Sequence, residues 1–275
     1  MLRSFRATQL TTTAERGGVS QKTLLGAILH GRQSRSLADD PLKRILDICG
    51  ALFGLVFLGP LLIACAAAIK VTSRGPVFYL QPRYGRDGKI FWIFKFRTMA
   101  TAPRSHAELG CIHDHAARTT FVGHRLRRHC IDELPQLINV LKGDMSLVGP
   151  RAHPVGLHVK GVLYEDLAPN YHSRHLLRPG ISGLAQVMGF RGVIDTVAHA
   201  ITRLEYDQIY IAHRTMTLDL CIIGFSLCFF LVGGGYKATK FPLQWFLPAA
   251  QAFGNGETVA EPNRSLANRL LRPGG

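Results

Sequence analysis

The sequence predicts a small mixed α/β domain, joined to a membrane by a proline-broken helix near its N-terminus and by interfacial helices. Residues 48–69 carry no formal charge, yet Gly59 and Pro60 interrupt them. Alternating apolar residues around a glycine-bearing turn predict a hairpin over 77–94. Apolar residues at helical spacing predict a helix over 195–213. We expect four segments: a basic flexible arm (1–40), a re-entrant membrane helix (41–74), a folded domain with an interfacial C-terminal helix (75–236) and a tail (237–275).

The uncharged run at 48–69 has 22 residues, enough to cross a hydrocarbon layer of ~30 Å as one helix. Pro60 removes a helical hydrogen bond in the middle of the run and favours a break there. Basic side chains prefer the cytoplasmic side of a membrane, and they flank the run at both ends: Lys43, Arg44, Lys70 and Arg74. These features favour a helix that enters the membrane and returns. A single crossing is the second alternative, and a buried soluble helix is the third.

The other segments are less specific. The arm over 1–40 either touches anionic lipid or is a solvated tail, and its composition does not decide between the two. Residues 101–120 read as a polar loop with helical portions. A second uncharged run, 220–236, is shorter and ends in three glycines, which favours an interfacial helix over a second membrane crossing.

Composition restricts the class of protein. With 47% hydrophobic residues the 275-residue chain can form a packed core, and its formal net charge of +15 favours anionic partners. Nucleic acid, acidic lipid and phosphorylated substrates all fit that charge. Six cysteines without CxxC spacing predict reduced thiols in a cytoplasm-facing protein. The stretch at 111–115 resembles a zinc site only faintly, because it has no second ligand pair.

The strongest chemical signal lies at residues 127–137. Pro135 suits the first turn of a helix and Gly143 suits its end, which places Asp132 and Glu133 at the helix N-terminus. Two adjacent carboxylates in so basic a chain suit Mg²⁺, and one of them could attack a phosphorus centre. The plainer alternative is an N-cap aspartate with a solvated neighbour.

Basic residues also lie before and after residues 127–137 in the sequence. Lys95 and Arg97 alternate with apolar residues, as in a strand with one phosphate-facing side. Arg151 follows Gly149 and Pro150 in a rigid turn. Arginine binds phosphate oxygens in a bidentate way, and lysine supplies a compact charge. The pattern therefore indicates a phosphate-binding site.

This ordered set of motifs resembles the bacterial sugar transferases, the monotopic polyprenyl-phosphate phosphoglycosyl transferases. The resemblance covers residues 41–236. It rests on the proline-broken run, the Lys-Phe-Arg-Thr-Met block at 95–99, the Asp-Glu-Leu-Pro-Gln-Leu block at 132–137, the Gly-Pro-Arg turn at 149–151 and the segments at 179–186 and 206–210. The block at 132–137 is the most specific of these.

The resemblance implies an α/β domain on the cytoplasmic face of the bacterial inner membrane. It implies that Asp132 attacks the β-phosphate of a UDP-sugar, releasing UMP, and that undecaprenyl phosphate then takes the sugar phosphate from the aspartate. Such a step initiates exopolysaccharide, O-antigen or glycoconjugate synthesis. Asp132 and Glu133 would be the catalytic residues and would hold Mg²⁺. The implied substrate-binding residues are Lys95, Arg97, Arg127, Arg151, Gln186, Arg191 and Asp207.

Three departures from the family pattern bear on these roles. Arg151 is followed by Ala152 and His153, whereas the family commonly has Pro-Arg-Pro. Cys130 stands where Ser or Thr is common. Phe190 precedes Arg191 where the family has Asn-Gly-Arg, which affects the roles of Gln186 and Arg191 in nucleotide or sugar recognition.

Other functions fit less well. A nucleic-acid-binding protein would explain the charge but not the broken apolar run, and we expect no nucleic-acid partner. A soluble nucleotide-sugar glycosyltransferase usually needs an Asp-x-Asp motif, and none occurs. A non-catalytic membrane scaffold for polysaccharide assembly stays open as the alternative. Anionic membrane lipid is an expected partner, and no residue identifies the sugar.

Overall fold

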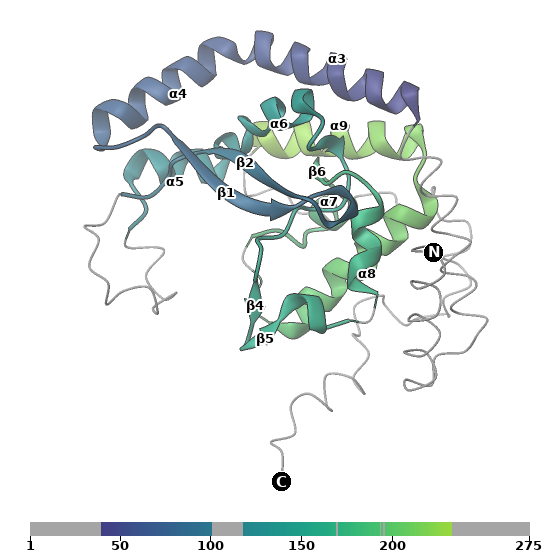
Figure 1. The fold of residues 1–275 in the computed structure, drawn as a ribbon. Coiled ribbons are helices and arrows are strands. Elements are labelled where there is room, and N and C mark those ends of the chain that lie inside the picture. Colours follow the sequence, from purple (N-terminus) through teal and green to yellow (C-terminus); the bar gives the residue numbers. More distant parts are fainter. Residues whose placement is uncertain (1–39, 101–117, 169, 193, 195, 233–275) are drawn as a thin grey trace, which may run out of the picture.

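The computed structural model describes residues 40–100, 118–168, 170–192, 194 and 196–232 (Figure 1). The helices are α3 (Pro41–Phe57), α4 (Gly59–Thr72), α5 (Phe121–Arg128), α6 (Gln136–Lys142), α7 (Leu184–Val187), α8 (Val197–His213) and α9 (Met216–Val232). The strands are β1 (Phe78–Tyr84), β2 (Ile90–Phe96), β3 (Ser146–Val148), β4 (His158–Val159), β5 (Val162–Leu163) and β6 (Gly180–Ser182). Short 3-10 helices are η1 (Arg86–Gly88), η3 (Ile131–Glu133), η4 (Tyr164–Asp166) and η5 (Tyr171–Leu176). The predictions made for the N-terminal arm, for residues 101–117 and for the C-terminal tail lie outside the described residues.

The proline-broken helix is a bent pair, α3 and α4, which arches over the rest of the molecule (Figure 1). Asp40 caps α3 by accepting a hydrogen bond from Leu42 N at 2.9 Å. The chain breaks at Leu58, and Pro60 lies in the first turn of α4, where its missing N–H is no loss. The two helices are bent by 61°. No single helix in the described ranges has the length and apolar character of a membrane span, although this bent pair does when taken together.

The outer side of this pair is apolar and exposed. Five side chains there are at least 69% exposed: Phe53, Val56, Phe57, Ile63 and Val71. The inner side buries Ala51, Cys65 and Ile69 against the domain. A contiguous apolar surface of this kind marks a contact with lipid or with another protein.

The N-terminal end of α3 is tied into the domain by a buried ion-pair cluster. Lys43 Nζ lies 3.1 Å from Asp47 Oδ1 and 3.0 Å from Asp219 Oδ2. Asp47 Oδ1 also accepts hydrogen bonds from Ser146 Oγ and Leu147 N, both at 3.0 Å. Lys43 is therefore a link between α3, α9 and β3, in addition to being one of the basic flanks expected from the sequence.

Arg44 makes a second link. Its guanidinium donates to Val140 O at 2.8 Å and to Leu141 O at 3.1 Å, in the last turn of α6. Val140 O also accepts from Gly143 N at 3.0 Å, so the arginine adds to the cap at the end of α6. The helix that follows the candidate carboxylates is thus held at its end by the apolar helix pair.

The hairpin predicted over 77–94 is confirmed as antiparallel β1 and β2, with β2 extending to Phe96. The register pairs Tyr79 with Lys95 and Arg83 with Phe91. Because side chains alternate along a strand, Arg83 and Lys95 lie on the same face of the hairpin. Phe91 and Ile93 on that face are buried against α6. The packed core therefore fixes which way Lys95 points.

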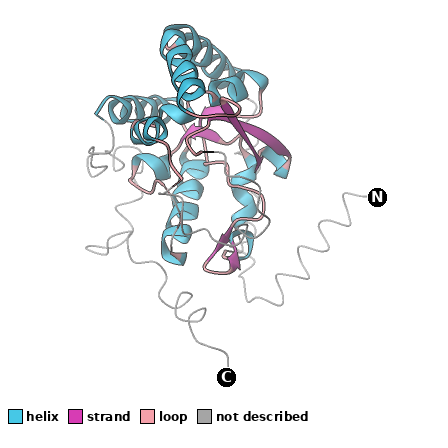
Figure 2. Ribbon diagram, turned by 90° about the vertical axis from the view of Figure 1, so that its left-hand side faces the viewer, coloured by secondary structure: helices cyan, strands magenta, loops and turns pink. Residues whose placement is uncertain are grey.

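A short parallel pair, β3 and β6, lies at the centre of the domain and pairs Ser146 with Gly180 and Val148 with Ser182. Its strands pack against α7, α8 and α9. The helix predicted over 195–213 is confirmed as α8. The second hairpin, β4 and β5, lies at the end of the molecule opposite the α3–α4 pair, as Figures 1 and 2 both show. The turn that carries Arg151 begins where β3 ends.

Gly123 allows α5 to lie against the main chain that follows β2. A Cβ atom at this position would lie 2.0 Å from Thr98 O. That carbonyl accepts a hydrogen bond from Thr120 N at 3.0 Å and is not free to move. Gly123→Ala is therefore expected to destabilise the protein by about 1–3 kcal/mol, measured by thermal unfolding.

Gly224→Ala is the matched control, because nothing lies within 4 Å of its Cβ position in α9. It is expected to be neutral or to stabilise by up to about 1 kcal/mol. Equal unfolding temperatures for the two variants would contradict the close approach of α5 to Thr98.

Candidate active site

The two candidate carboxylates lie in η3, the single turn that precedes α6. The predicted helix is confirmed: α6 begins at Gln136, directly after Pro135, and Gly143 ends it in the left-handed conformation (φ 89°). Cys130 starts the turn with φ 56°, a value that is uncommon outside glycine. This sharp change of direction separates α5 from α6 and presents Asp132 and Glu133 side by side.

Glu133 is the centre of an ion-pair cluster. Lys95 Nζ lies 2.6 Å from its Oε1 atom. Arg151 binds both carboxylate oxygens, with Nη1 3.0 Å from Oε2 and Nη2 2.5 Å from Oε1. The structure thus brings together three of the residues predicted from separate motifs, with side chains that are mostly buried.

The protonation of this cluster follows from its contacts. Burial acts to raise the pKa of Glu133, but Arg151 and Lys95 outweigh it and hold that pKa well below its usual range. Burial lowers the pKa of Lys95, and Glu133 opposes that shift. The pKa of Arg151 is raised, chiefly by Glu133. At neutral pH the cluster is therefore a carboxylate held between two cations.

Asp132 differs from its neighbour. Within the described residues its carboxylate forms no hydrogen bond and no ion pair. Burial and the neighbouring Glu133 raise the pKa of Asp132, while Lys95, Arg127 and Arg151 act in the opposite direction. A carboxylate without hydrogen bonds, close to three cations, is available to react or to bind a metal.

Arg127 and Arg97 both donate hydrogen bonds to neighbouring segments of the chain. Arg127 Nε donates to Thr98 Oγ1 at 2.8 Å, and its side chain is exposed near Asp132. Arg97 does not join the Glu133 cluster, because β2 ends at Phe96 and the strand alternation stops there. Its guanidinium instead donates to the carbonyls of Ser73 and Arg74, after the end of α4. Arg97 fixes the exit of the apolar helix pair.

Gln186 and Arg191 lie together. Arg191 Nε donates to Gln186 O at 2.6 Å, and its guanidinium carbon lies 3.4 Å from the centre of the Phe229 ring. Gln186 Nε2 donates to Ile181 O at 3.0 Å, whereas its buried Oε1 has no hydrogen-bond partner in the described structure. Arg191 is close enough to Cys130 and Glu133 for both to raise its pKa against the larger effect of burial. The pair therefore borders the cluster from the side of α9.

Asp207 was expected to bind substrate, and its position argues against that role. Its carboxylate is 3% exposed and lies 2.7 Å from Arg174 Nη2. Burial raises the pKa of Asp207 to about 6, with Arg174 and Arg203 acting in the opposite direction. A carboxylate enclosed in this way supports the fold around Arg174 and is closed to solvent in this structure.

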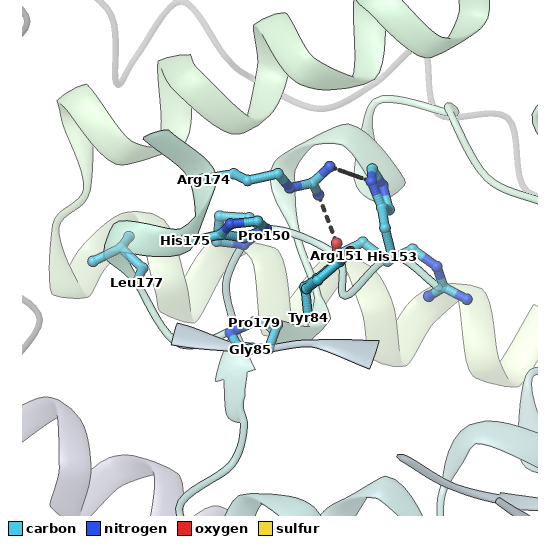
Figure 3. Close-up of a pocket in the computed structure, with 9 residues that line it drawn as sticks. All are labelled: Tyr84, Gly85, Pro150, Arg151, His153, Arg174, His175, Leu177 and Pro179. Carbon is cyan, nitrogen blue, oxygen red and sulfur yellow. Dashed lines mark hydrogen bonds between the residues drawn. The ribbon is translucent and has the colours of Figure 1, made fainter. Parts of the chain in front are cut away.

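Arg174 borders a small pocket beside Arg151, shown in Figure 3. It donates to Arg151 O at 2.6 Å and to the ring of His153. Because a guanidinium can only donate, the His153 nitrogen must accept, and His153 is neutral there. Burial and Arg174 hold the pKa of His153 well below its usual range.

The sequence interpretation missed Arg83 and Arg174. Arg83 lines the same small pocket as Lys95 and Arg151, and burial followed by Arg151 lowers its pKa to about 10. The hairpin alternation contained the signal for Arg83, because residues at 83 and 95 share a face once the register is known. Arg174 lies in η5, outside every motif, and no local pattern marks it.

The carboxylate pair fits a magnesium ion. Mg²⁺ in proteins is usually held by one or two carboxylates together with substrate phosphates and water. Asp132 has free oxygens, and Glu133 Oε2 has one hydrogen bond where Oε1 has two. No group of three or more His, Cys, Asp or Glu side chains suited to a metal occurs in the described part of the chain. The two cations beside Glu133 repel a bare ion, so the carboxylates alone are a weak site for free Mg²⁺.

A carboxylate without hydrogen bonds in the described residues, beside an arginine–lysine clamp and on a domain that carries a bent apolar helix pair, is the arrangement expected of a phosphate-handling transferase. The chain belongs to the bacterial sugar transferase family, whose sequence model matches residues 38–232. The resemblance seen in the motifs is thereby confirmed.

Several curated proteins are similar to this chain. It is 43% identical over 182 residues to the exopolysaccharide production protein PSS of Rhizobium leguminosarum bv. phaseoli, covering 66% of this chain and 91% of that protein. It is 42% identical over 181 residues to the UDP-glucose:undecaprenyl-phosphate glucose-1-phosphate transferase of Klebsiella pneumoniae, covering 66% and 38%. It is 38% identical over 225 residues to the UDP-N-acetylgalactosamine-undecaprenyl-phosphate N-acetylgalactosaminephosphotransferase of Aeromonas hydrophila, covering 78% and 52%. The chain thus spans about half or less of these two transferases.

Proposed function

We propose that this chain transfers a sugar-1-phosphate from a UDP-sugar to undecaprenyl phosphate and releases UMP. The observation that carries the proposal is the contrast within the carboxylate pair: Glu133 is clamped by Lys95 and Arg151, whereas Asp132 has no such partner. The names of the relatives from Klebsiella and Aeromonas support the two substrate classes.

The reaction proceeds in two displacements at one phosphorus atom. An Asp132 oxygen attacks the β-phosphorus of the UDP-sugar, the bond from that phosphorus to the bridging oxygen breaks, and UMP leaves with the bond's electron pair. The aspartate then carries the phosphosugar. An oxygen of undecaprenyl phosphate attacks the same phosphorus, the bond to Asp132 breaks, and the carboxylate is restored. One carboxylate therefore serves a soluble donor and a lipid acceptor in turn.

The cations supply what phosphoryl transfer needs, which is positioning and neutralisation of charge. Lys95 and Arg151 carry two positive charges against the single charge of Glu133, so the cluster keeps a net positive charge for a phosphate. Asp132 and Glu133 would hold Mg²⁺ together with the diphosphate, and the ion would supply neutralisation of charge on the phosphate oxygens. Arg127 is exposed beside Asp132 and suits the same substrate.

The apolar helix pair supports a proposal for where the reaction takes place. The exposed outer side of α3 and α4 suits contact with lipid, and we propose that the pair, which is bent by 61°, enters one leaflet and returns to the same side. The formal charge of +15 favours anionic lipid. On this reading the protein lies on the cytoplasmic face of the bacterial inner membrane, where UDP-sugars are present.

The proposal is tested by UMP release from detergent-solubilised protein. The assay contains undecaprenyl phosphate, Mg²⁺ and either UDP-glucose or UDP-N-acetylgalactosamine, the two donors suggested by relatives' names. UMP formation that requires lipid for turnover, and that EDTA abolishes, is the expected result. Release of UDP would contradict phosphosugar transfer, and no release from a folded protein with a broad donor panel would favour a scaffold.

A further inference from the structure

The turn that carries Arg151 is held by an unbroken series of hydrogen bonds to its main chain. Pro150 O accepts from Gly180 N at 3.0 Å, and His153 O accepts from Tyr84 N at 3.2 Å. The two carbonyls between them, those of Arg151 and Ala152, accept from side chains. Four successive carbonyls are therefore bonded in a segment that has only isolated bridge pairing with β-structure.

The two side-chain donors are arginines from different elements. Arg174 in η5 donates to Arg151 O at 2.6 Å, and Arg83 in β1 donates to Ala152 O at 2.8 Å. Arg174 thus binds the carbonyl of the Arg151–Ala152 peptide, and Arg83 binds the carbonyl of the Ala152–His153 peptide. Because Pro150 O is bonded as well, the peptides before and after the Arg151 Cα atom are both held, which restrains the direction in which the Arg151 side chain leaves the main chain.

Arg174 is itself fixed more firmly than a surface arginine. It is 4% exposed, pairs with Asp207 at 2.7 Å, donates to the His153 ring and lies with its guanidinium carbon 5.5 Å from the centre of the Tyr171 ring. Ala152 stands where the family commonly has the second proline of Pro-Arg-Pro, and His153 follows it. The hydrogen bonds from Arg174 to Arg151 O and to the His153 ring therefore restrain the turn on both sides of a position that lacks the rigid proline ring.

We propose that Arg174, held by Asp207, is a positioning residue for Arg151: it fixes the main chain of the turn so that the Arg151 guanidinium faces the phosphate site before substrate binds. This inference rests on the proposed function for its substrate and reassigns Asp207 from substrate binding to support. The effect on phosphate is indirect and passes through Arg151.

A residue that acts through Arg151 loses its effect once Arg151 is impaired. The test is a double-variant cycle with Arg174→Lys and Arg151→Lys, read as kcat/KM for UMP release and as the affinity for UDP measured by calorimetry with Mg²⁺. Each single variant is expected to lose about 10- to 100-fold in kcat/KM, since small misplacements of a binding group cost this much. The double variant is expected to lie within about threefold of Arg151→Lys alone.

Arg203→Lys is the matched control. Arg203 is also 4% exposed, but it donates to Phe190 O and Gly192 O and not to the Arg151 turn. Any loss of kcat/KM caused by Arg203→Lys is expected to multiply with the loss caused by Arg151→Lys when the two are combined. Asp207→Asn is expected to reproduce the pattern of Arg174→Lys, which keeps the test available if one variant folds poorly.

The outcomes separate the two proposals. UMP release with multiplying effects of Arg174→Lys and Arg151→Lys, or with no effect of Arg174→Lys, would overturn the positioning role and leave the transfer reaction in place. Suppose instead that no donor gives UMP, while Arg174→Lys and Arg151→Lys each weaken UDP binding and the double variant is no weaker than Arg151→Lys alone. That result would support the positioning role and overturn the reaction.

Discussion

Asp132→Asn is expected to abolish UMP release, with a loss of at least about 10⁴-fold, the scale seen when a nucleophile is removed. Asparagine keeps the size of the side chain but not the negative charge that attacks phosphorus. Asp132 makes no hydrogen bond or ion pair within the described residues, so this change should leave the fold intact. The second measurement is intact mass after incubation with UDP-sugar in the absence of lipid: the wild type is expected to gain one phosphosugar, and the variant none.

Asp87→Asn provides a control with the same chemical change. Asp87 lies in the hairpin turn with φ 56°, a conformation that asparagine tolerates well, and its side chain is about half exposed. It should keep the activity and the mass gain of the wild type. UMP release that persists in Asp132→Asn would assign the attack to another group and would leave Asp132 as a metal ligand only.

Glu133→Gln is expected to have the largest combined effect on stability and activity. It leaves Lys95 and Arg151 without their counter-ion in a mostly buried site. Removing one partner of a buried pair costs about 3–5 kcal/mol, and glutamine retains an acceptor, so about 3 kcal/mol is expected. For a chain of this size the unfolding temperature should fall by roughly 6–12 °C. The rate of UMP release should fall as well, and a higher Mg²⁺ concentration should be needed for half-maximal activity.

The difference in unfolding free energy between wild type and Glu133→Gln should depend on pH if it arises from the lost charge of Glu133, and this dependence distinguishes that cause from damage to packing. Because Lys95 and Arg151 hold the pKa of Glu133 below that of an unfolded glutamate, the charge contributes stability above the unfolded value of about 4.3. That contribution is lost as the pH falls through the folded-state pKa. The difference between wild type and variant should be full at neutral pH and shrink below about pH 4.3. A difference that stays constant on acidification would point to packing.

The elements with a strong local signal were predictable from the sequence. Pro60 indicated the helix break, the apolar alternation indicated the hairpin, and Gly143 indicated the end of the helix after the carboxylates. Local chemistry decides each of these features. The break itself falls at Leu58, two residues before the proline, because Pro60 occupies the first turn of the next helix.

The candidate site residues differ in the same way: some lie in local motifs, and others depend on contacts with distant segments. Lys95, Glu133 and Arg151 were found from motifs, since each is presented by a local element. Arg97 and Asp207 were assigned to substrate binding, but their partners come from distant segments, the end of α4 and η5. Arg174 lacks a motif altogether. Hydrogen bonds between distant segments depend on tertiary packing, which residue spacing does not encode.

A shortened protein that begins after Thr72 would lose parts of its interior. Deleting Lys43 leaves the carboxylate of Asp219 buried beside Tyr210 without its counter-ion, and deleting Arg44 removes two hydrogen bonds to the carbonyls of the last turn of α6. Replacing exposed residues of this pair, such as Phe53 and Val56, with polar ones leaves these contacts in place, because those side chains face outward. The α3–α4 pair is thus part of the packed domain, so redesigning its exposed surface preserves what truncation would remove.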